Sequence, residues 1–170
     1  YDGKKIVYNQ PSQLAKLDLD VPYKKYFLGK SHIKENNVIK KPLDFSVKNF
    51  MNLMDQHRFL IQVIFPENAD SNQALNLTKS DYDFLLKKMS ILPRESHNPE
   101  YDMDQYYDGY CKFFLYGDKK EKISDDIRIF NKVGLAYGFL LDNAYIVDFK
   151  NNVEFFLSAI IYGNENEILN

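Results

Sequence analysis

The sequence predicts an α+β fold in which helices pack on an antiparallel sheet. Apolar residues recur at helical spacing in residues 46–117, whereas from Ile127 onwards they alternate with a period of two. Helices followed by consecutive strands are typical of helices gathered against an antiparallel sheet. We divide the 170 residues into a strand and long loop (1–45), a helical part (46–117) and antiparallel strands (118–170), all within one domain.

Composition places the chain among globular proteins. Hydrophobic residues make up 45% and aromatic residues 15%, which excludes intrinsic disorder. The 22 basic and 24 acidic residues give a net charge of -2 without a basic stripe, so we predict no nucleic-acid partner. The single cysteine, Cys111, excludes an internal disulfide framework and a cysteine-based zinc site.

The sequence carries no membrane or export signal. No apolar run approaches the roughly 18 residues of a membrane helix, so we predict no membrane span. No signal peptide is recognisable either. Because the chain starts at Tyr1 without an initiator methionine, we expect it to be a fragment of a longer protein.

The N-terminal region is predicted to contain one strand and a long connection. Lys4 to Tyr8 favour an extended strand that Pro11 closes. The residues from Ser12 to Leu43 show no clean period, and we predict a long surface loop there.

Two helices follow with clear boundaries. The first is capped by Asn52 and ends at Pro66. In the second, Thr78 is the N-cap, Asp81 three residues later forms a carboxylate variant of the capping box, and Pro93 ends the helix. Their apolar stripes are Leu53, His57, Leu60, Ile61 and Ile64 in the first, and Tyr82, Leu85 and Met89 in the second.

A third helix and three strands complete the prediction. The third helix is expected from Asp102 to Gly117. The strands are expected at residues 127–132, 144–149 and 153–162. Lys150-Asn151-Asn152 suits a tight turn, because asparagine tolerates a positive φ, and the strands therefore form an antiparallel meander.

Most polar residues have a structural interpretation that outweighs the functional one. The three histidines, His32, His57 and His97, lack the spacing of metal ligands, and we predict neither a metal nor a cofactor. His57 lies on an apolar stripe and is expected to be a packed, hydrogen-bonded residue. Cys111 beside Lys112 is either a reactive thiolate or, as we favour, a small buried hydrophobic residue.

Two further segments leave alternatives open. The segment from Tyr101 to Tyr116 is rich in tyrosine and aspartate, which could bind sugar or calcium. We favour a helix start rich in aspartate, because the segment lacks the alternating oxygen ligands of an EF-hand. Ser96 lies just beyond a helix end, but no G-x-S-x-G motif surrounds it, so we do not favour it as a nucleophile.

The tripeptide Lys132-Val133-Gly134 has the strongest functional interpretation. It lies on a strand that follows the helices and precedes a hairpin of apolar strands. An ammonium on an edge strand supplies positive potential to a nucleophile and to an anionic substrate. Glycine lets a substrate approach the backbone, and the next free N–H, that of Leu135, can serve an oxyanion hole. Alternatively, Lys132 only begins a strand.

Several segments in order resemble a family of β-lactamase-like serine hydrolases from Bacteroidetes-type bacteria. They are "NLMDQHRFLIQVIFPE", "NLTKSDYDFLLKKMSILPRES", "YYDGYCKFFLYGD" and "IRIFNKVGLAYGFLLDNAYIVDFKNNVEFFLSAIIY". The resemblance covers about Asp2 to Asn164. It implies a β-lactamase/transpeptidase-like fold, of the kind found in class A β-lactamases and penicillin-binding proteins, and hydrolysis of an amide or ester through an acyl-enzyme.

The resemblance also assigns residues. Lys132 matches the catalytic lysine of the Lys-Thr-Gly motif, Gly134 its glycine, and the N–H of Leu135 one oxyanion donor. Val133 replaces the usual threonine or serine and has no hydroxyl for a substrate carboxylate. Neither Ser-x-x-Lys nor Ser-Asp-Asn occurs in the chain, so we expect the nucleophile upstream of Tyr1 and the chain alone to be inert.

The implied partners follow from the same family. The substrate would be a small molecule or peptidoglycan-like, and the protein periplasmic or otherwise extracytoplasmic. The outer strands and terminal helix of the family's sheet would be missing, so we expect the chain to need its upstream part or self-association to cover that sheet. The alternatives are a non-catalytic, carbohydrate-binding relative and a purely structural domain.

Overall fold

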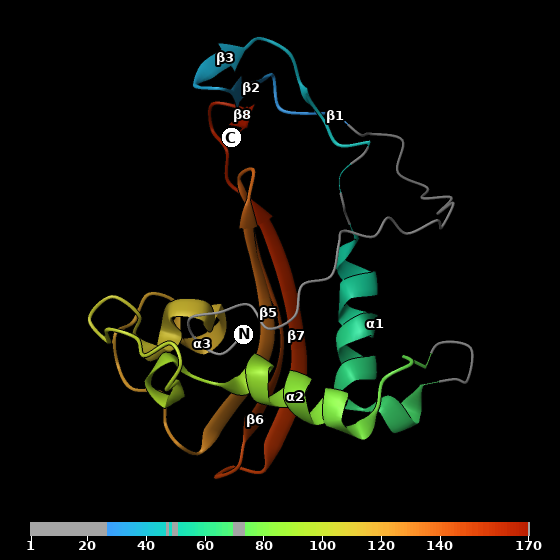
Figure 1. Cartoon of the computed structure of the whole chain (residues 1–170), viewed down its shortest axis with the longest axis vertical. Coiled ribbons are helices and arrows are strands. Elements are labelled where there is room, and N and C mark those ends of the chain that lie inside the picture. Colours follow the sequence, from blue (N-terminus) through green and yellow to red (C-terminus); the bar gives the residue numbers. More distant parts are fainter. Residues whose placement is uncertain (1–26, 47, 49–50, 70–73, 170) are drawn as a thin grey trace.

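The computed structural model describes residues 27–46, 48, 51–69 and 74–169, so the strand predicted at Lys4–Tyr8 lies outside the described residues. Its centre is an antiparallel sheet of three ten-residue strands, in the order β5 (Ile127–Ala136), β6 (Phe139–Asp148) and β7 (Val153–Tyr162) (Figure 1). The chain is therefore a mixed α+β protein, as the sequence predicts, and its C-terminal strands form the predicted meander.

The hairpin between β5 and β6 is longer than predicted. The strands continue to a two-residue turn, Tyr137-Gly138, in which both residues have a positive φ (54° and 84°). This is the turn geometry whose twist matches that of a hairpin. The turn between β6 and β7 lies where predicted, and Asn152 has the expected positive φ of 52°.

The predicted long loop is wrong for its described part, because residues 27–44 hold four short strands. They are β1 (Phe27–Leu28), β2 (Ser31–Lys34), β3 (Asn37–Ile39) and β4 (Leu43–Asp44). β1 pairs with β4, and β2 pairs with β3 and, in parallel, with the C-terminal β8 (Ile168–Leu169). Pairing with a strand more than 130 residues away leaves no periodic signal in the local sequence.

The first two helices are confirmed. α1 (Leu53–Ile64) begins after Asn52, whose side chain accepts a hydrogen bond from the backbone N–H of Asp55. α2 (Lys79–Ser90) begins at the predicted capping box, in which Thr78 and Asp81 each bond the other's backbone. One-turn 3₁₀ helices follow each of them, at Pro66–Asn68 (η1) and Pro93–Glu95 (η2).

The predicted third helix is wrong. Its segment forms a 3₁₀ turn, η3 (Asp108–Cys111), and a single helical turn, α3 (Phe113–Tyr116). Gly109 is buried with the carbonyl oxygens of Gly117 and Lys119 close by, so the chain folds back on itself here. The amides at the start of α3 bond the side chain of Asp142 on β6, and these long-range bonds replace helical ones.

The helices lie on both sides of the large sheet (Figure 1). On the α3 side, Ile129, Ala144 and Ile146 form a buried cluster against which Phe114 and Tyr116 pack. On the α1 side, Phe65 just after α1 makes edge-to-face contacts with Tyr145 and Phe156 of the sheet. No described helix is long and apolar enough to cross a bilayer.

Candidate functional site

β5 is an edge strand, and alternate residues direct their backbone groups away from β6. The carbonyl oxygen of Ile129 accepts a hydrogen bond from Nζ of Lys112 at 2.9 Å, so Ile129 faces outwards. Residues two apart on an antiparallel strand point the same way. The N–H of Leu135 therefore faces the outer edge of β5, where the resemblance to serine hydrolases predicts an oxyanion donor.

The described residues cover the first half of this edge and leave its second half open. Lys112 bonds Ile129 and also the carbonyl oxygen of Met89 at the end of α2, at 2.6 Å, so the end of α2 covers the first half. No described strand pairs with the outer edge of β5. Leu135 is 77% exposed and borders an open pocket of about 480 Å³, which is also lined by Ala136, Tyr137 and Gly138.

Lys132 lies at the open half. Its side chain is exposed, and its Nζ donates a hydrogen bond to the carbonyl oxygen of Val133. The carbonyl group of Val133, like that of Ile129, points away from β6. This contact therefore places the ammonium of Lys132 beside the outer edge of β5. Gly134 has no positive φ, and a Cβ there would be 3.4 Å from the side chain of Leu141, an ordinary contact. The fold therefore does not itself require glycine at position 134.

Two residues at the end of this edge were missed from the sequence. Nζ of Lys48 donates a hydrogen bond to the hydroxyl of Tyr137 at 3.0 Å and lies 5.2 Å from the centre of its ring. Phe45 packs edge-to-face on Tyr137 with ring centres 5.0 Å apart. These residues are about 90 positions apart in the chain, and no local pattern connects them.

Directly behind the edge lies a buried polar network of Lys112, Asn131 and Asp142. Nζ of Lys112 donates to Oδ1 of Asn131 at 2.7 Å, and Nδ2 of Asn131 donates to Oδ1 of Asp142 at 2.9 Å. Oδ2 of Asp142 accepts from the amides of Phe113 and Phe114 at 3.1 and 3.3 Å. Burial lowers the pKa of Lys112 to about 8 and raises the pKa of Asp142.

All three N–H groups of the Lys112 ammonium have acceptors, namely Met89, Ile129 and Asn131. A neutral amine has only two N–H groups and would leave one of these buried acceptors unpaired. This network therefore fixes the position of β5 against α2 and α3 rather than offering a free base.

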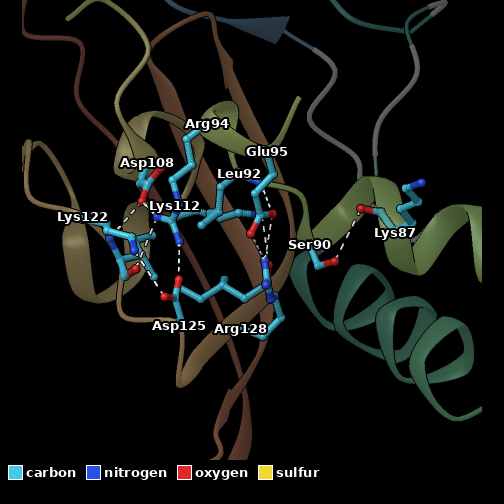
Figure 2. A network of polar contacts seen from close by, with 12 residues as sticks. Lys87, Ser90, Leu92, Arg94, Glu95, Asp108, Lys112, Lys122, Asp125 and Arg128 are labelled. Carbon is cyan, nitrogen blue, oxygen red and sulfur yellow. Dashed lines mark hydrogen bonds and ion pairs between the residues drawn. The ribbon is translucent and has the colours of Figure 1, made fainter. Parts of the chain in front are cut away.

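A second polar network joins η2, η3 and β5 (Figure 2). Arg94 pairs with the buried Asp108 and with Asp125, and Oδ2 of Asp108 also accepts from the amide of Ile123 at 3.0 Å. Beside it, Nη1 of Arg128 bonds both oxygens of Glu95 at 2.8 and 2.9 Å.

The position of Glu95 is fixed from two sides. Oε2 of Glu95 also accepts from the amide of Leu92 at 3.0 Å. Burial alone would raise the pKa of Glu95, but the hydrogen bonds from Arg128 and Leu92 lower it overall. Oδ1 of Asp108 is buried without a hydrogen-bond partner among the described residues, whereas the other charged groups of both networks are paired with one another. We therefore assign both networks to stability.

Ser158 on β7 and His57 on α1 form a serine–histidine contact that sequence analysis did not pair. Oγ of Ser158 is 2.7 Å from Nδ1 of His57 and donates its proton to Oδ1 of Asn143. Nδ2 of Asn143 donates to the carbonyl oxygen of Gln56 at 2.8 Å, which fixes the orientation of the amide. The hydroxyl has a single proton, so Nδ1 of His57 is the donor in this contact and not a base for Ser158.

The remaining candidates are not assembled into a site. Among the described residues no cluster of His, Cys, Asp and Glu could hold a metal ion. Ser96 donates its hydroxyl proton to the carbonyl oxygen of Pro99 at 2.7 Å. Cys111 is an exposed residue, so the prediction of a buried one is wrong, and partial burial of its thiol raises its pKa, which disfavours a thiolate.

Comparisons with known proteins do not identify the chain. It matches no model of a known protein family, no curated protein and no solved structure. The resemblance to β-lactamase-like serine hydrolases stays a prediction from the sequence.

Proposed function

We propose that the chain is the C-terminal part of a β-lactamase/transpeptidase-like serine hydrolase, and that the open half of β5 is one wall of its active site. The observation that carries the proposal is the coincidence of an outward N–H at Leu135, an exposed ammonium at Lys132 and an adjoining pocket on one uncovered strand edge.

The chemistry is acyl transfer to a serine supplied by the segment upstream of Tyr1. The N–H of Leu135 would stabilise the oxyanion that forms when the serine attacks the carbonyl carbon. Lys132 would give the edge the positive potential that favours this negative charge. Ser158 is not the nucleophile, because its proton is donated to Asn143 and its histidine partner donates to it.

The substrate follows in part from Val133. A side chain without a hydroxyl cannot donate to the carboxylate of a penicillin-like substrate. We therefore expect the parent protein to prefer an amide or ester whose recognition does not depend on that carboxylate. We also propose that the protein is extracytoplasmic and that its substrate belongs to the cell wall.

The test uses the full-length parent protein and a fluorescent fluorophosphonate, which acylates activated serines. We expect labelling of the parent and none of the 170-residue chain. Lys132→Ala should slow labelling by at most about 10²-fold, because Lys132 supplies positive potential and the removal of a direct oxyanion-hole donor costs about 10²- to 10³-fold. Lys150→Ala, in the exposed turn after β6, is the control and should label as the wild type does. An unlabelled parent would refute the proposal.

A cluster of tyrosines favours a non-catalytic binding module as the second candidate. Tyr101, Tyr106, Tyr107 and Tyr110 contact one another with ring centres 5.0–6.2 Å apart, and Tyr101 and Tyr110 are exposed. Exposed aromatic rings beside carboxylates suit a sugar ligand. Calorimetric titration with soluble peptidoglycan fragments tests this function: binding that Tyr110→Ala abolishes, in a parent that fluorophosphonate does not label, would favour it over the hydrolase.

A further inference from the structure

We propose that the outer edge of β7 pairs with β7 of a second copy of this chain, which joins two three-stranded sheets into one antiparallel sheet. The inference goes beyond the proposed function and does not depend on it. It rests on three properties of β7, namely its free backbone groups, its unprotected edge and its self-complementary sequence.

The free backbone groups follow from the strand register. Every second residue of β6, starting with Phe139, uses its backbone N–H and C=O groups for hydrogen bonds to β5. The residues between them use theirs for hydrogen bonds to β7. The β7 residues left facing outwards are Glu154, Phe156, Ser158, Ile160 and Tyr162. Among the described residues, no strand pairs with this edge and no side chain bonds its backbone groups.

The edge of β7 lacks the protection that the edge of β5 has. On β5, Lys112 and Lys132 donate to outward carbonyl groups, and α2 covers the first half. β7 contains no lysine, arginine, proline or glycine. Its only charged residue, Glu154, accepts a hydrogen bond from the hydroxyl of Tyr145 within the same sheet. A long apolar edge strand without such features favours pairing with another strand.

The described residues also leave one face of β7 uncovered. Its side chains on the face opposite α1 include Val153, Phe155, Leu157 and Ile161, which are 48%, 39%, 39% and 60% exposed. Of the strands, only β5 and β6 contribute residues to the described cluster under α3, so α3 does not cover these side chains of β7. In a two-fold pair the same face of both copies lies on the same side, and the two stripes become one apolar surface.

The sequence of β7 is complementary to itself about Ser158. A two-fold axis there pairs all five outward-facing residues: Ser158 with its own copy, Phe156 with Ile160, and Glu154 with Tyr162. On the exposed face the same register brings Phe155 beside Ile161 and Leu157 beside Ala159. The two glutamates are about eight residues apart along the pair, or about 27 Å, so no like charges meet.

This complementarity is the reason for a second copy rather than an unrelated strand. The closed two-fold arrangement uses both free β7 edges and leaves outside the β5 edges, whose first half is covered by the end of α2 and whose second half carries Lys132. Association therefore stops at a dimer.

The decisive variant is Ile160→Pro. The N–H of Ile160 points away from β6, so proline removes a bond to the second copy and none within the sheet. We expect the 170-residue wild type to be a dimer in analytical ultracentrifugation across the micromolar range. Ile160→Pro should raise the dissociation constant by about tenfold or more, since each copy loses an N–H at the interface and gains a ring that clashes with the partner. Ile160→Val keeps the N–H and should remain a dimer.

A second variant keeps the test decisive if Ile160→Pro fails to fold, which circular dichroism would show. Leu157→Lys places two like charges beside the two-fold axis, on an exposed face, and should also produce monomers. Leu135→Lys, at the exposed end of β5, is its matched control and should not. A monomeric wild type, or a dimer that Leu157→Lys leaves intact, would overturn the proposal. If the chain is monomeric and its β7 amides are protected from hydrogen exchange only in the longer parent, the upstream segment occupies this edge and not a second copy.

Discussion

Nζ of Lys112 lies 2.9 Å from the carbonyl oxygen of Ile129, at the outer edge of β5. This contact closes the first half of the edge, because the same ammonium also bonds the end of α2. The second half, from Val133 to Leu135, stays open. One buried lysine therefore both holds the sheet against α2 and limits where a ligand can reach the strand.

The first prediction concerns this lysine. Lys112→Met should lower the free energy of unfolding by about 2–4 kcal/mol, because methionine fills the space but leaves three buried acceptors without a donor. Urea denaturation at pH 7 measures the loss. Lys79→Met, which breaks an exposed i,i+4 pair with Asp83 on α2, is the control and should change stability by less than about 0.5 kcal/mol. A Lys112→Met variant as stable as the wild type would contradict this role.

The second prediction concerns pH. The pKa of Lys112 is lowered from 10.5 to about 8 by burial. Below pH 8 both folded and unfolded states carry the proton, and Lys112 causes no pH dependence. Between about pH 8 and 10.5 only the unfolded state keeps it, so the stability contributed by this group rises with pH. The rise is of order 3 kcal/mol over the window, since one pKa unit is about 1.4 kcal/mol.

Other lysines and tyrosines titrate in the same range, so the measurement is a comparison of wild type and Lys112→Met in urea at several pH values. The stability difference between them should widen from pH 8 to pH 10.5. A difference that stays constant would mean that Lys112 titrates with an ordinary pKa.

The third prediction concerns the turn beside the candidate site. Gly138 has a φ of 84°, and a Cβ there would be 2.8 Å from Cβ of Asn164. Gly138→Ala should therefore cost about 1–3 kcal/mol of stability. Gly163→Ala is the matched control, since a Cβ at Gly163 meets no atom within 4 Å, and should be almost neutral. Equal melting temperatures for the two variants would be inconsistent with this geometry.

The fourth prediction separates structure from catalysis at Ser158. Ser158→Ala leaves Oδ1 of Asn143 and Nδ1 of His57 unpaired, so it should cost about 1–2 kcal/mol in thermal unfolding. It should not change fluorophosphonate labelling of the parent protein. Ser90→Ala, at the end of α2, should alter neither quantity by much. Lost labelling with unchanged stability would identify Ser158 as a nucleophile and refute our assignment.

Much of the fold could be predicted because its signals are local. A helix cap needs only a side chain and an amide three residues away, so Asn52 and Thr78 are visible in the sequence. Strand alternation beyond Ile127 is local in the same sense. The segment from Asp102 to Gly117 could not be predicted, because its amides bond Asp142 on β6 and its glycine packs on a later loop.

The candidate site shows the same division. The sequence by itself determined that Lys132, Gly134 and Leu135 share a strand, because residue order and period are properties of the chain alone. Only the tertiary structure decided that this strand lies at an edge, that Lys112 covers half of it, and that Lys48 reaches Tyr137 at its end. Those contacts join residues 17 to 89 positions apart, and their free energy arises from burial and pairing that no short stretch of sequence contains.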